Sequence, residues 1–472
     1  MTAVFLGLIA FSLVLAVLSK RGHAQQKAED FFVASGQFRT ILFFFLAVGE
    51  TYSITTILGY PGGIYAKGTG TAIWFLGYIL LAFVVGYFLN PLIWRAGRIH
   101  GAVTLPDLFR RHYESRALEL AVTVASLIFL VPLGTSQFLG LETVLKQLDW
   151  AVSPWMLTSL AGVLAFIYIA ISGIRASAYV AVLKDLLLIA SVLLAGLAAL
   201  AHWGVAHAGA AFAHHIATPT REDDVFAITT ILLQSVGFCI VPQTCAYIFT
   251  ARSANTVRRA QITMPLYMVM FPFLTLVAYF ALEHGLAVKA PNEVFLSVAH
   301  LLLPAPVVGL VMAGTVLSAL VILTGICLAI GPLVSRNLVP GLTGDQQRRW
   351  SQVVMALYLL LSVIGAAKSS QLLTTINNLF YFGIVQSLPG VLGILFLRRM
   401  RPLAIIAGLV AGDAVAIWIF ELKIPVAGIN AGFIGLLVNF AIVFAALYLS
   451  PGRERTPIIA RRPRAAPDFP QR

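Results

Sequence analysis

The feature that most constrains this chain is a regular alternation between long apolar runs and short connections of unequal charge. Thirteen runs are long enough to cross a bilayer, which takes about 20 helical residues. Beginning after the first run, every second connection, together with the C-terminal tail, holds 25 of the 32 Lys and Arg residues, and the other connections hold six. Because Lys and Arg are retained on the cytoplasmic side, the pattern predicts a multi-pass protein of a bacterial-type inner (plasma) membrane. Its N-terminus is expected outside and its C-terminus in the cytoplasm.

Composition argues against a soluble domain and against a nucleic-acid partner. Hydrophobic residues make up 59% of the chain and charged residues 11%, whereas soluble domains carry about 25% charged residues. The net charge of +13 is spread over short loops and forms no continuous basic stripe, so the expected partner is the lipid bilayer. Cys239, Cys245 and Cys327 lie inside apolar runs without metal-ligand spacing. We therefore predict no cofactor, no metal cluster and no disulfide framework.

The predicted architecture is all-α. The spans are 2–19, 38–65, 72–94, 117–146, 154–173, 178–202, 225–250, 262–283, 297–334, 350–367, 370–397, 402–421 and 427–449.

Two of these spans carry helix breakers near their middle. The second span contains Gly49 and, toward its outer end, Gly59, Pro61 and Gly62–Gly63; the seventh contains Pro242. Backbone freed by a break must line a cavity or be buried in protein, and paired breaks in two halves are typical of an inverted-repeat transporter with its site near the midplane. The alternative is that these residues merely kink two packing helices.

The position of the breaks divides the chain into segments. We expect an N-out lead helix and cytoplasmic loop (1–37), a first five-helix repeat (38–202), an extracellular loop (203–224), a second five-helix repeat (225–397), two peripheral helices (398–450) and a disordered basic cytoplasmic tail (451–472). Since five is odd, the second repeat inserts upside down relative to the first.

Ionisable residues inside the predicted spans are functional candidates, because a charge at the bilayer centre is costly. Glu50 lies close to the midplane and could bind a cation, carry a proton, or form a structural pair with Lys184. Lys184 either snorkels to the surface or is a fixed internal cation that stands where a sodium ion would sit. Neighbouring helical residues point about 100° apart, so Lys184 and Asp185 are not expected to serve one pair; one of them needs a partner on another span.

Amides and hydroxyls at membrane depth can donate to a carboxylate or hydroxyl substrate. Each alone is more often a contact between helices than a ligand. The candidates for substrate contact are Tyr52, Ser53, Gln137, Gln243 and Gln386, and Gln234, Asn377 and Asn378 carry further amides. Gln243 is favoured because it follows Pro242 at the second break.

The motifs along the chain resemble those of the sodium:solute symporter family over about residues 1–450. Residues 29–36 resemble the family's DFFLAGR segment, and 97–113 resemble its GxxTxPDFLxxRY cytoplasmic loop. Residues 172–176 and Lys184–Asp185 are similar to its GGxxA and TDxxQ elements, with Lys for Thr and no final Gln. The resemblance implies a LeuT-type 5+5 inverted repeat with about 13 transmembrane helices, one span before the repeats and two after.

Within the family, the chain most resembles the monocarboxylate permease branch, which is associated with lactate, pyruvate and some small amino acids. That branch has VKD on the same span, where this chain has Leu183–Asp185 (LKD), an ALVP…TRN pattern matching Ala319–Val321 and Ser335–Asn337, and QTLP matching Gln386–Pro389. Gln243 stands where a His is expected in this branch.

The resemblance also implies a sodium site, and here the chain departs from the pattern. The family's backbone carbonyls fall on Gly49 and Tyr52, and its small residue and two hydroxyls fall on Ser318, Val321 and Ile322. Val321 and Ile322 cannot supply the oxygen ligands that a hard cation prefers. The site is therefore degenerate, and a proton is favoured slightly over sodium as the coupling ion.

Taken together, the sequence predicts a secondary active symporter that imports a small organic solute, with a monocarboxylate such as lactate or pyruvate favoured, and works by alternating access. The ion-coupling residues would be Gly49, Glu50, Tyr52, Lys184, Asp185 and Ser318. The alternatives are a sodium-coupled symporter of another small solute, such as an amino acid, pantothenate or a sugar, and a transporter-like membrane sensor. An enzyme is not expected, because no His lies in the middle of a span.

Overall fold

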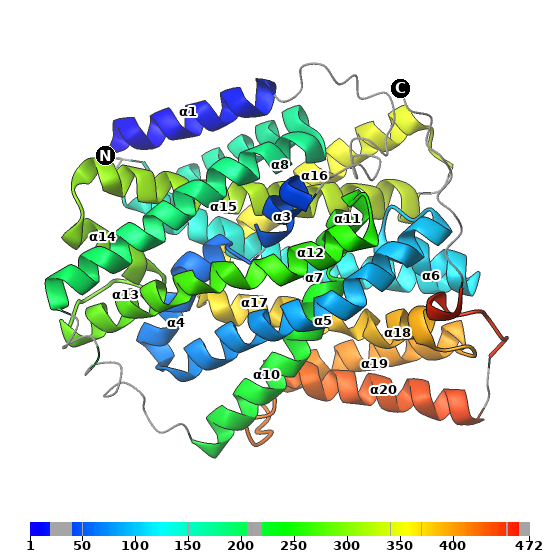
Figure 1. The fold of residues 1–472 in the computed structure, drawn as a ribbon. Helices are drawn as coiled ribbons and strands as arrows, with labels where there is room; N and C mark the ends of the chain where they lie inside the picture. The colour runs from blue at the N-terminus through cyan, green and yellow to red at the C-terminus, as the bar shows by residue number, and fades with distance from the viewer. Residues whose placement is uncertain are drawn as a thin grey trace.

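The computed structural model describes residues 1–18, 40–49, 51–148, 152–204, 209, 220–339, 341–369, 371–449 and 452–461. These residues form helices joined by short connections (Figure 1). Up to residue 204, the elements are α1 (Thr2–Leu18), α3 (Thr40–Val48), the π-helical turn η2 (Thr55–Gly59), α4 (Tyr60–Lys67), α5 (Gly70–His100), α6 (Leu105–Tyr113), α7 (Arg116–Lys146) and α8 (Pro154–Trp203).

The second half of the chain repeats this organisation with more short turns. Its elements are α10 (Arg221–Ile240), α11 (Pro242–Thr250), α12 (Ala254–Thr263), η3 (Met264–Met270), α13 (Phe271–Glu283), η4 (Pro291–Glu293), α14 (Val294–Leu302), α15 (Ala305–Pro332), η5 (Leu333–Leu338), α16 (Gly344–Lys368), α17 (Leu373–Ile384), η6 (Val385–Ser387), α18 (Leu388–Phe396), α19 (Pro402–Glu421), α20 (Ala431–Leu449) and η7 (Ile458–Ala460).

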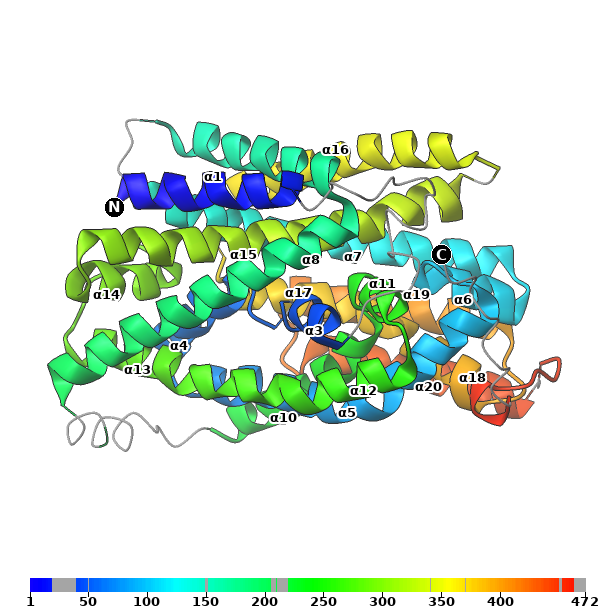
Figure 2. The same ribbon diagram turned by 45° about the horizontal axis from the view of Figure 1, so that its top comes forward.

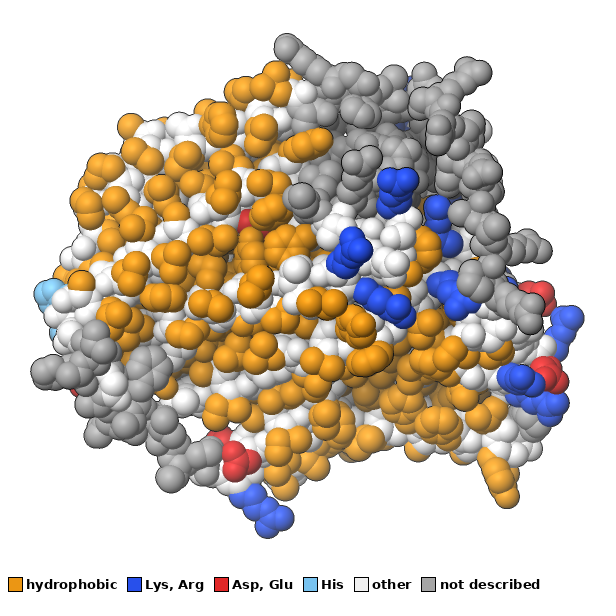
Figure 3. All heavy atoms as spheres, in the orientation of Figure 1, with side chains coloured by type: hydrophobic (Ala, Val, Ile, Leu, Met, Phe, Trp, Pro, Cys, Tyr) orange, Lys and Arg blue, Asp and Glu red, His pale blue; other side chains and the backbone are white. Residues whose placement is uncertain are grey.

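Ten helical segments of the described chain are long and apolar enough to cross a membrane, and α1 is a shorter apolar helix of 17 residues. Their outward faces carry large apolar side chains such as Phe88, Leu266 and Leu403, and apolar side chains dominate the visible surface in Figure 3. In water such a surface would be a strong association site, whereas in lipid it is solvated. The chain is thus a multi-pass membrane protein, and the count of thirteen spans stays a prediction.

Helix α8 differs from the expectation of two separate spans, 154–173 and 178–202. It is helical over 50 residues, which would extend about 75 Å if straight, far more than the bilayer core of about 30 Å. Figure 2 shows that α8 instead bends sharply and forms two arms. The expected connection between the arms is helical because residues 174–177 contain no Pro, and an isolated Gly173 is tolerated inside a helix.

The centre of the molecule is α15, and the last two helices lie at its edge. In the most apolar 18-residue stretch of the α15–η5 segment 89% of the residues are buried, whereas in the corresponding stretch of α20 28% are buried. α15 contacts α1, α7, α8 and α16, while α19 and α20 pack mainly on each other. Since α15 is enclosed by protein rather than by lipid, polar groups beside it must find partners within the fold.

Arginines gather at one end of the helix bundle, which we call the Arg-rich end (Figure 3). It is defined by Arg95, Arg98, Arg110, Arg111, Arg116, Arg336, Arg398, Arg399, Arg453 and Arg455. Helix α6 lies at this end and begins with a reciprocal cap: Thr104 accepts from the backbone N–H of Asp107, whose carboxylate accepts from the backbone N–H of Thr104.

The C-terminal segment is folded over part of the length that was predicted to be disordered. The backbone N–H of Arg455 donates to the carbonyl of Arg398 at 2.7 Å, its guanidinium donates to the carbonyl of Tyr113 at 3.0 Å, and Ile458 is fully buried. The prediction of a disordered tail is therefore wrong for residues 452–461, because one apolar side chain and several backbone bonds dock it on α5, α6 and α18. Residues 462–472 lie outside the described residues.

Candidate functional site

The first broken helix opens between α3 and η2. α3 ends at Val48 and η2 begins at Thr55, so the carbonyls of Gly49 and Tyr52 are turned away from a regular helical ladder. Local side chains replace part of the lost bonding, since the Thr56 hydroxyl donates to the carbonyl of Thr51 at 2.5 Å. Glu50, the most prominent candidate from the sequence, lies outside the described residues.

The second broken helix opens between α10 and α11 at a single residue. Val241 has extended backbone angles (φ −56°, ψ 135°), and Pro242, which lacks an N–H, is the first residue of α11. This change of direction brings the first turn of α11, with Gln243 and Thr244, to the same cavity that the first break reaches.

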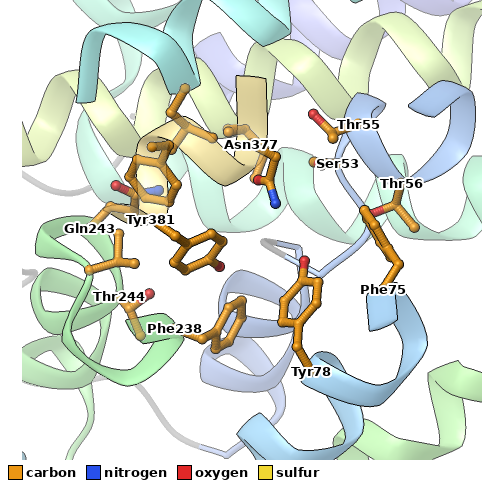
Figure 4. Close-up of a pocket in the computed structure, with 14 residues that line it drawn as sticks. Ser53, Thr55, Thr56, Phe75, Tyr78, Phe238, Gln243, Thr244, Asn377 and Tyr381 are labelled. Atoms are coloured by element: carbon orange, nitrogen blue, oxygen red, sulfur yellow. The ribbon is translucent and has the colours of Figure 1, made fainter. Parts of the chain in front are cut away.

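The cavity has a volume of about 40 Å³, room for roughly three water molecules at 10–15 Å³ each. Figure 4 shows it enclosed by side chains from both breaks and from α5, α10 and α17. Its lining is Ser53, Thr55, Thr56, Phe75, Tyr78, Leu133, Phe238, Val241, Gln243, Thr244, Ile322, Asn377, Phe380 and Tyr381. The cavity is thus compact.

Aromatic rings and uncharged polar groups make up most of the cavity wall. The Asn377 amide points into the cavity, and the Tyr78 hydroxyl is close to Asn377 and Tyr381 (Figure 4). Two buried amide atoms that line the space have no protein hydrogen-bond partner: Nδ2 of Asn377, a donor, and Oε1 of Gln243, an acceptor. Buried polar atoms are normally paired, so these two are candidates for contact with a solute.

The structure brings two of the five predicted substrate contacts, Ser53 and Gln243, to this cavity. Tyr52 is buried beside it, but its hydroxyl donates to the carbonyl of Tyr267 and it is not part of the wall. Gln137 is fully buried in α7, where its amide donates to the Ser136 hydroxyl at 3.1 Å.

Gln386 lies elsewhere, which contradicts its predicted role in substrate binding. Its amide nitrogen donates to the carbonyls of Phe382 and Gly432, and its amide oxygen accepts from Asn439 in α20 at 3.1 Å. Gln386 therefore joins η6 to the peripheral helices, because the turn at 385–387 directs it outward from α17. It is one of the contacts between helices that the sequence left as the alternative.

Six polar residues of the cavity were not chosen from the sequence as substrate contacts: Thr55, Thr56, Tyr78, Thr244, Asn377 and Tyr381. A signal was present, because Tyr is common at membrane interfaces, whereas Tyr78 and Tyr381 occur well inside apolar runs. Asn377 was recognised as a mid-span amide, but nothing in the sequence placed it opposite Tyr78.

Five of the six predicted ion-coupling residues, all except Glu50, meet in space around the ammonium of Lys184. Its Nζ lies 3.4 Å from the carbonyl oxygens of both Gly49 and Tyr52. The Ser318 hydroxyl of α15 donates to the same Tyr52 carbonyl at 2.9 Å. Lys184 has no exposed side-chain surface, so the interpretation that it snorkels to the membrane surface is wrong.

Lys184 and Asp185 also form an ion pair with each other, Nζ to Oδ1 at 2.5 Å. The prediction that they cannot serve one pair is wrong, because the long Lys side chain curls toward its neighbour while the two Cα–Cβ bonds still diverge. Both side chains are fully buried, and neither carboxylate oxygen of Asp185 accepts a hydrogen bond of good geometry. The contact is electrostatic rather than a directed hydrogen bond.

The ion site and the cavity share two continuous pieces of chain. Tyr52 contacts Lys184 while the next residue, Ser53, lines the cavity. On α15, Ser318 binds the Tyr52 carbonyl and Ile322, one turn later, lines the cavity. A shift of the segment around Tyr52 would therefore change both places at once.

A second buried cluster, which we call the Asp107 network, lies at the Arg-rich end. The Asn337 amide donates to the carboxylates of Asp107 and Glu119 at 2.9 and 2.8 Å. Arg336 pairs with Asp107 at 3.1 Å, and Arg110 and Arg116 pair with Glu119 at 2.7 and 2.6 Å. The network joins α6, α7 and η5.

Comparisons with known proteins agree with this architecture. The model of the sodium:solute symporter family matches residues 31–411. An uncharacterized symporter, YhjB of Bacillus subtilis (strain 168), is 26% identical over 469 residues, covering 94% of this chain and 95% of that protein. A monocarboxylate transport permease protein of Rhizobium johnstonii is 26% identical over 309 residues, covering 64% of this chain and 62% of that protein.

Solved structures show the fold. A substrate-bound, outward-open Na⁺-coupled sialic acid symporter aligns with a TM-score of 0.77 at 16% identity, covering 96% of this chain and 98% of that one. MhsT in complex with L-phenylalanine aligns with a TM-score of 0.55 at 13% identity, covering 87% and 100%. The predicted LeuT-type inverted-repeat fold is thereby confirmed.

Proposed function

The chain belongs to the sodium:solute symporter family, and from this premise we propose that it imports a small monocarboxylate, such as lactate or pyruvate, together with a proton. The observation that carries the proposal is the compact cavity between the two broken helices, with unpaired amide atoms from Gln243 and Asn377 in its wall. A symporter of a small solute follows from family and fold; the substrate and the coupling ion are the proposal.

A small carboxylate suits the chemistry of this wall. Lactate and pyruvate have six non-hydrogen atoms each, so the cavity of about 40 Å³ needs only a modest enlargement to hold one of them. Asn377 and Tyr78 offer donors to carboxylate oxygens. The N-terminus of α11 faces the cavity through Gln243 and Thr244, where the helix dipole favours a negative group. The relative from Rhizobium johnstonii, which is a monocarboxylate permease, supports the same substrate class.

The charge pattern supports an orientation in the membrane. We place the Arg-rich end in the cytoplasm, because Lys and Arg are retained there during insertion. The docked segment 452–461 lies at this end, so the C-terminus would be cytoplasmic and the N-terminus of α1 outside. Import then means that the solute reaches the cavity from the end opposite the arginines.

The choice of a proton opposes the coupling ion that the relatives suggest. The family is named for sodium, and the sialic acid symporter is Na⁺-coupled. In this chain Val321 and Ile322 bring hydrocarbon to positions where the family resemblance expects hydroxyls, and sodium prefers oxygen ligands. The supported alternative is sodium-coupled transport of the same solute class.

The test is uptake of labelled lactate and pyruvate into proteoliposomes of the full chain. We expect accumulation driven by an inward proton gradient without sodium. Strict dependence on a sodium gradient at fixed pH would contradict the proton, and accumulation of an amino acid, pantothenate or sugar but of neither carboxylate would contradict the substrate class.

A matched pair of variants on α5 connects uptake to the cavity. Tyr78→Phe removes a hydroxyl at the cavity, and Tyr87→Phe makes the same change outside its wall. We expect Tyr78→Phe to raise KM by roughly threefold to tenfold, the effect of one lost hydrogen bond, and Tyr87→Phe to leave it unchanged. Equal effects of the two changes would move the binding site elsewhere.

A further inference from the structure

We infer that the ion site between the first broken helix and α15 does not bind sodium, because the ammonium of Lys184 is a tethered cation that permanently occupies it. The inference deepens the proposed function, because the description of the Lys184 surroundings as a coupling site rests on that proposal. Its test uses sodium alone and needs no transported solute, so the two proposals can fail separately.

The first argument is geometric. The Nζ of Lys184 lies 3.4 Å from the carbonyl oxygens of Gly49 and of Tyr52, the two backbone groups that the family resemblance assigns to sodium. A Cβ added at Gly49 would lie 3.2 Å from the same nitrogen, so the ammonium fills the space directly against the broken helix. A sodium ion bound to these carbonyls would lie in contact with a like charge and would be repelled.

The second argument is that the ammonium is fully buried. Lys184 and Asp185 have no exposed side-chain surface. Of the helices that pack on α8, three carry no charged residue: α1, α3 and α15. The other ionisable side chains that interact with Asp185, among the residues described, are Tyr52 and Tyr267. Among the residues described, the ammonium is thus held by its neighbour Asp185 and by the two carbonyls.

The third argument is the chemistry of the remaining ligands. Of the three α15 positions in the predicted site, only Ser318 carries an oxygen, and that hydroxyl already donates to Tyr52. Ile322 lines the substrate cavity with hydrocarbon. If the Lys184 amine is removed, however, the carbonyls of Gly49 and Tyr52, the Ser318 hydroxyl and the Asp185 carboxylate remain together. This is an oxygen set of the kind that a hard cation binds.

Removal of the amine should therefore create the sodium site that the native chain lacks. The experiment measures thermal unfolding of the purified full chain in sodium chloride and in choline chloride. We expect the native chain to unfold at the same temperature in both salts. Lys184→Ser should unfold several degrees higher in sodium, because a ligand that binds only the folded state stabilises it. The double variant Lys184→Ser, Ser318→Ala should lose most of this difference.

A control and a second measurement make the result decisive. Leu186→Ser changes the lipid-facing residue two positions from Lys184 and should show no sodium effect. Saturable binding of radioactive sodium to the native chain that Ser318→Ala abolishes would overturn the inference. Absence of saturable binding, or binding that survives Ser318→Ala and therefore lies elsewhere, would support it. These measurements on the native chain and Ser318→Ala decide the question even if Lys184→Ser fails to fold.

Discussion

Two buried clusters of charge in this protein are built in opposite ways. In the Asp107 network, carboxylate oxygens accept from backbone N–H groups, from Asn337 and from arginines. In the Lys184–Asp185 pair, neither carboxylate oxygen accepts a well-directed hydrogen bond, although both side chains are more deeply buried. A network in which every oxygen is paired fixes one arrangement of helices, whereas a bare pair can be rearranged at lower cost.

The two clusters also lie at different places in the molecule. The Asp107 network joins α6, α7 and η5 at the Arg-rich end, where the bundle is tied together. The Lys184–Asp185 pair touches the unwound segment that also lines the substrate cavity. We therefore regard the first cluster as a structural fastening and the second as a part of the transport site.

The largest effect is expected when the Lys184–Asp185 pair is broken. Asp185→Leu leaves the Lys184 ammonium buried without its countercharge and should lower the free energy of unfolding by about 3–5 kcal/mol. Adding Lys184→Met should bring the protein back to within about 1 kcal/mol of the native chain, because a buried ion pair replaced by apolar groups costs little. Denaturant unfolding in detergent measures both values. A double variant as unstable as Asp185→Leu would show that the pair is itself a structural fastening.

The same operation on the Asp107 network should give the opposite pattern. Asp107→Leu removes the α6 cap and an acceptor of Asn337, and should lower the free energy of unfolding by about 2–4 kcal/mol. Adding Arg336→Met should not restore stability, because Asn337 and the backbone N–H groups of Val103 and Thr104 still lack their acceptor. Recovery in this double variant, measured in the same detergent, would erase the distinction between the two clusters.

The pH dependence of stability tests the comparison further, through a buried histidine at the Arg-rich end. Burial, with the nearby positive charges of His100, Arg461 and Arg455, lowers the pKa of His112 from 6.5 to about 3. Between these values the unfolded chain binds more protons than the native one, so stability falls as the pH falls below 6.5, by up to about 2 kcal/mol at pH 5. His112→Gln should flatten this part of the stability profile. An unchanged profile would place the acid sensitivity at another group.

The smallest effect is expected for an ion pair on the surface of the same end. Arg453 and Glu114 are paired at 3.2 Å, but both side chains are mostly exposed. Glu114→Gln should change the free energy of unfolding by less than about 0.5 kcal/mol. This variant is the baseline for the two buried clusters, and a loss comparable to that of Asp107→Leu would show that burial does not separate them.

Much of the fold could be read from the sequence because lipid imposes simple rules. The breaks at Gly49 and Pro242 and the apolar runs followed directly from backbone chemistry and bilayer thickness. The helical link within α8 and the docking of Ile458 were missed, because local composition does not reveal a bend or a distant contact. The sequence of the tail, rich in Pro and Arg, gave no sign of α5 and α18, the helices on which it docks.

The sequence indicated the kind of site to expect, but only some of the residues that form it. Sequence reasoning identified Lys184 and Asp185, since buried charges in a membrane need partners, and the family resemblance added Ser318. It did not foresee that Lys184 would reach Asp185, because the flexibility of a long side chain is not contained in a helical wheel. It also selected Gln386 over Asn377, because a turn of three residues decides which amide faces the cavity.

The tethered ammonium changes what the ion site can contribute to energy conversion. A dissolved ion is taken up on one side and released on the other, and each passage transfers free energy from its gradient to the solute. A cation fixed by a covalent bond returns with the protein after every cycle, so its occupancy is the same at any salt concentration. The affinity of this protein for its solute should accordingly be indifferent to external sodium, and any uphill accumulation must draw on a second gradient.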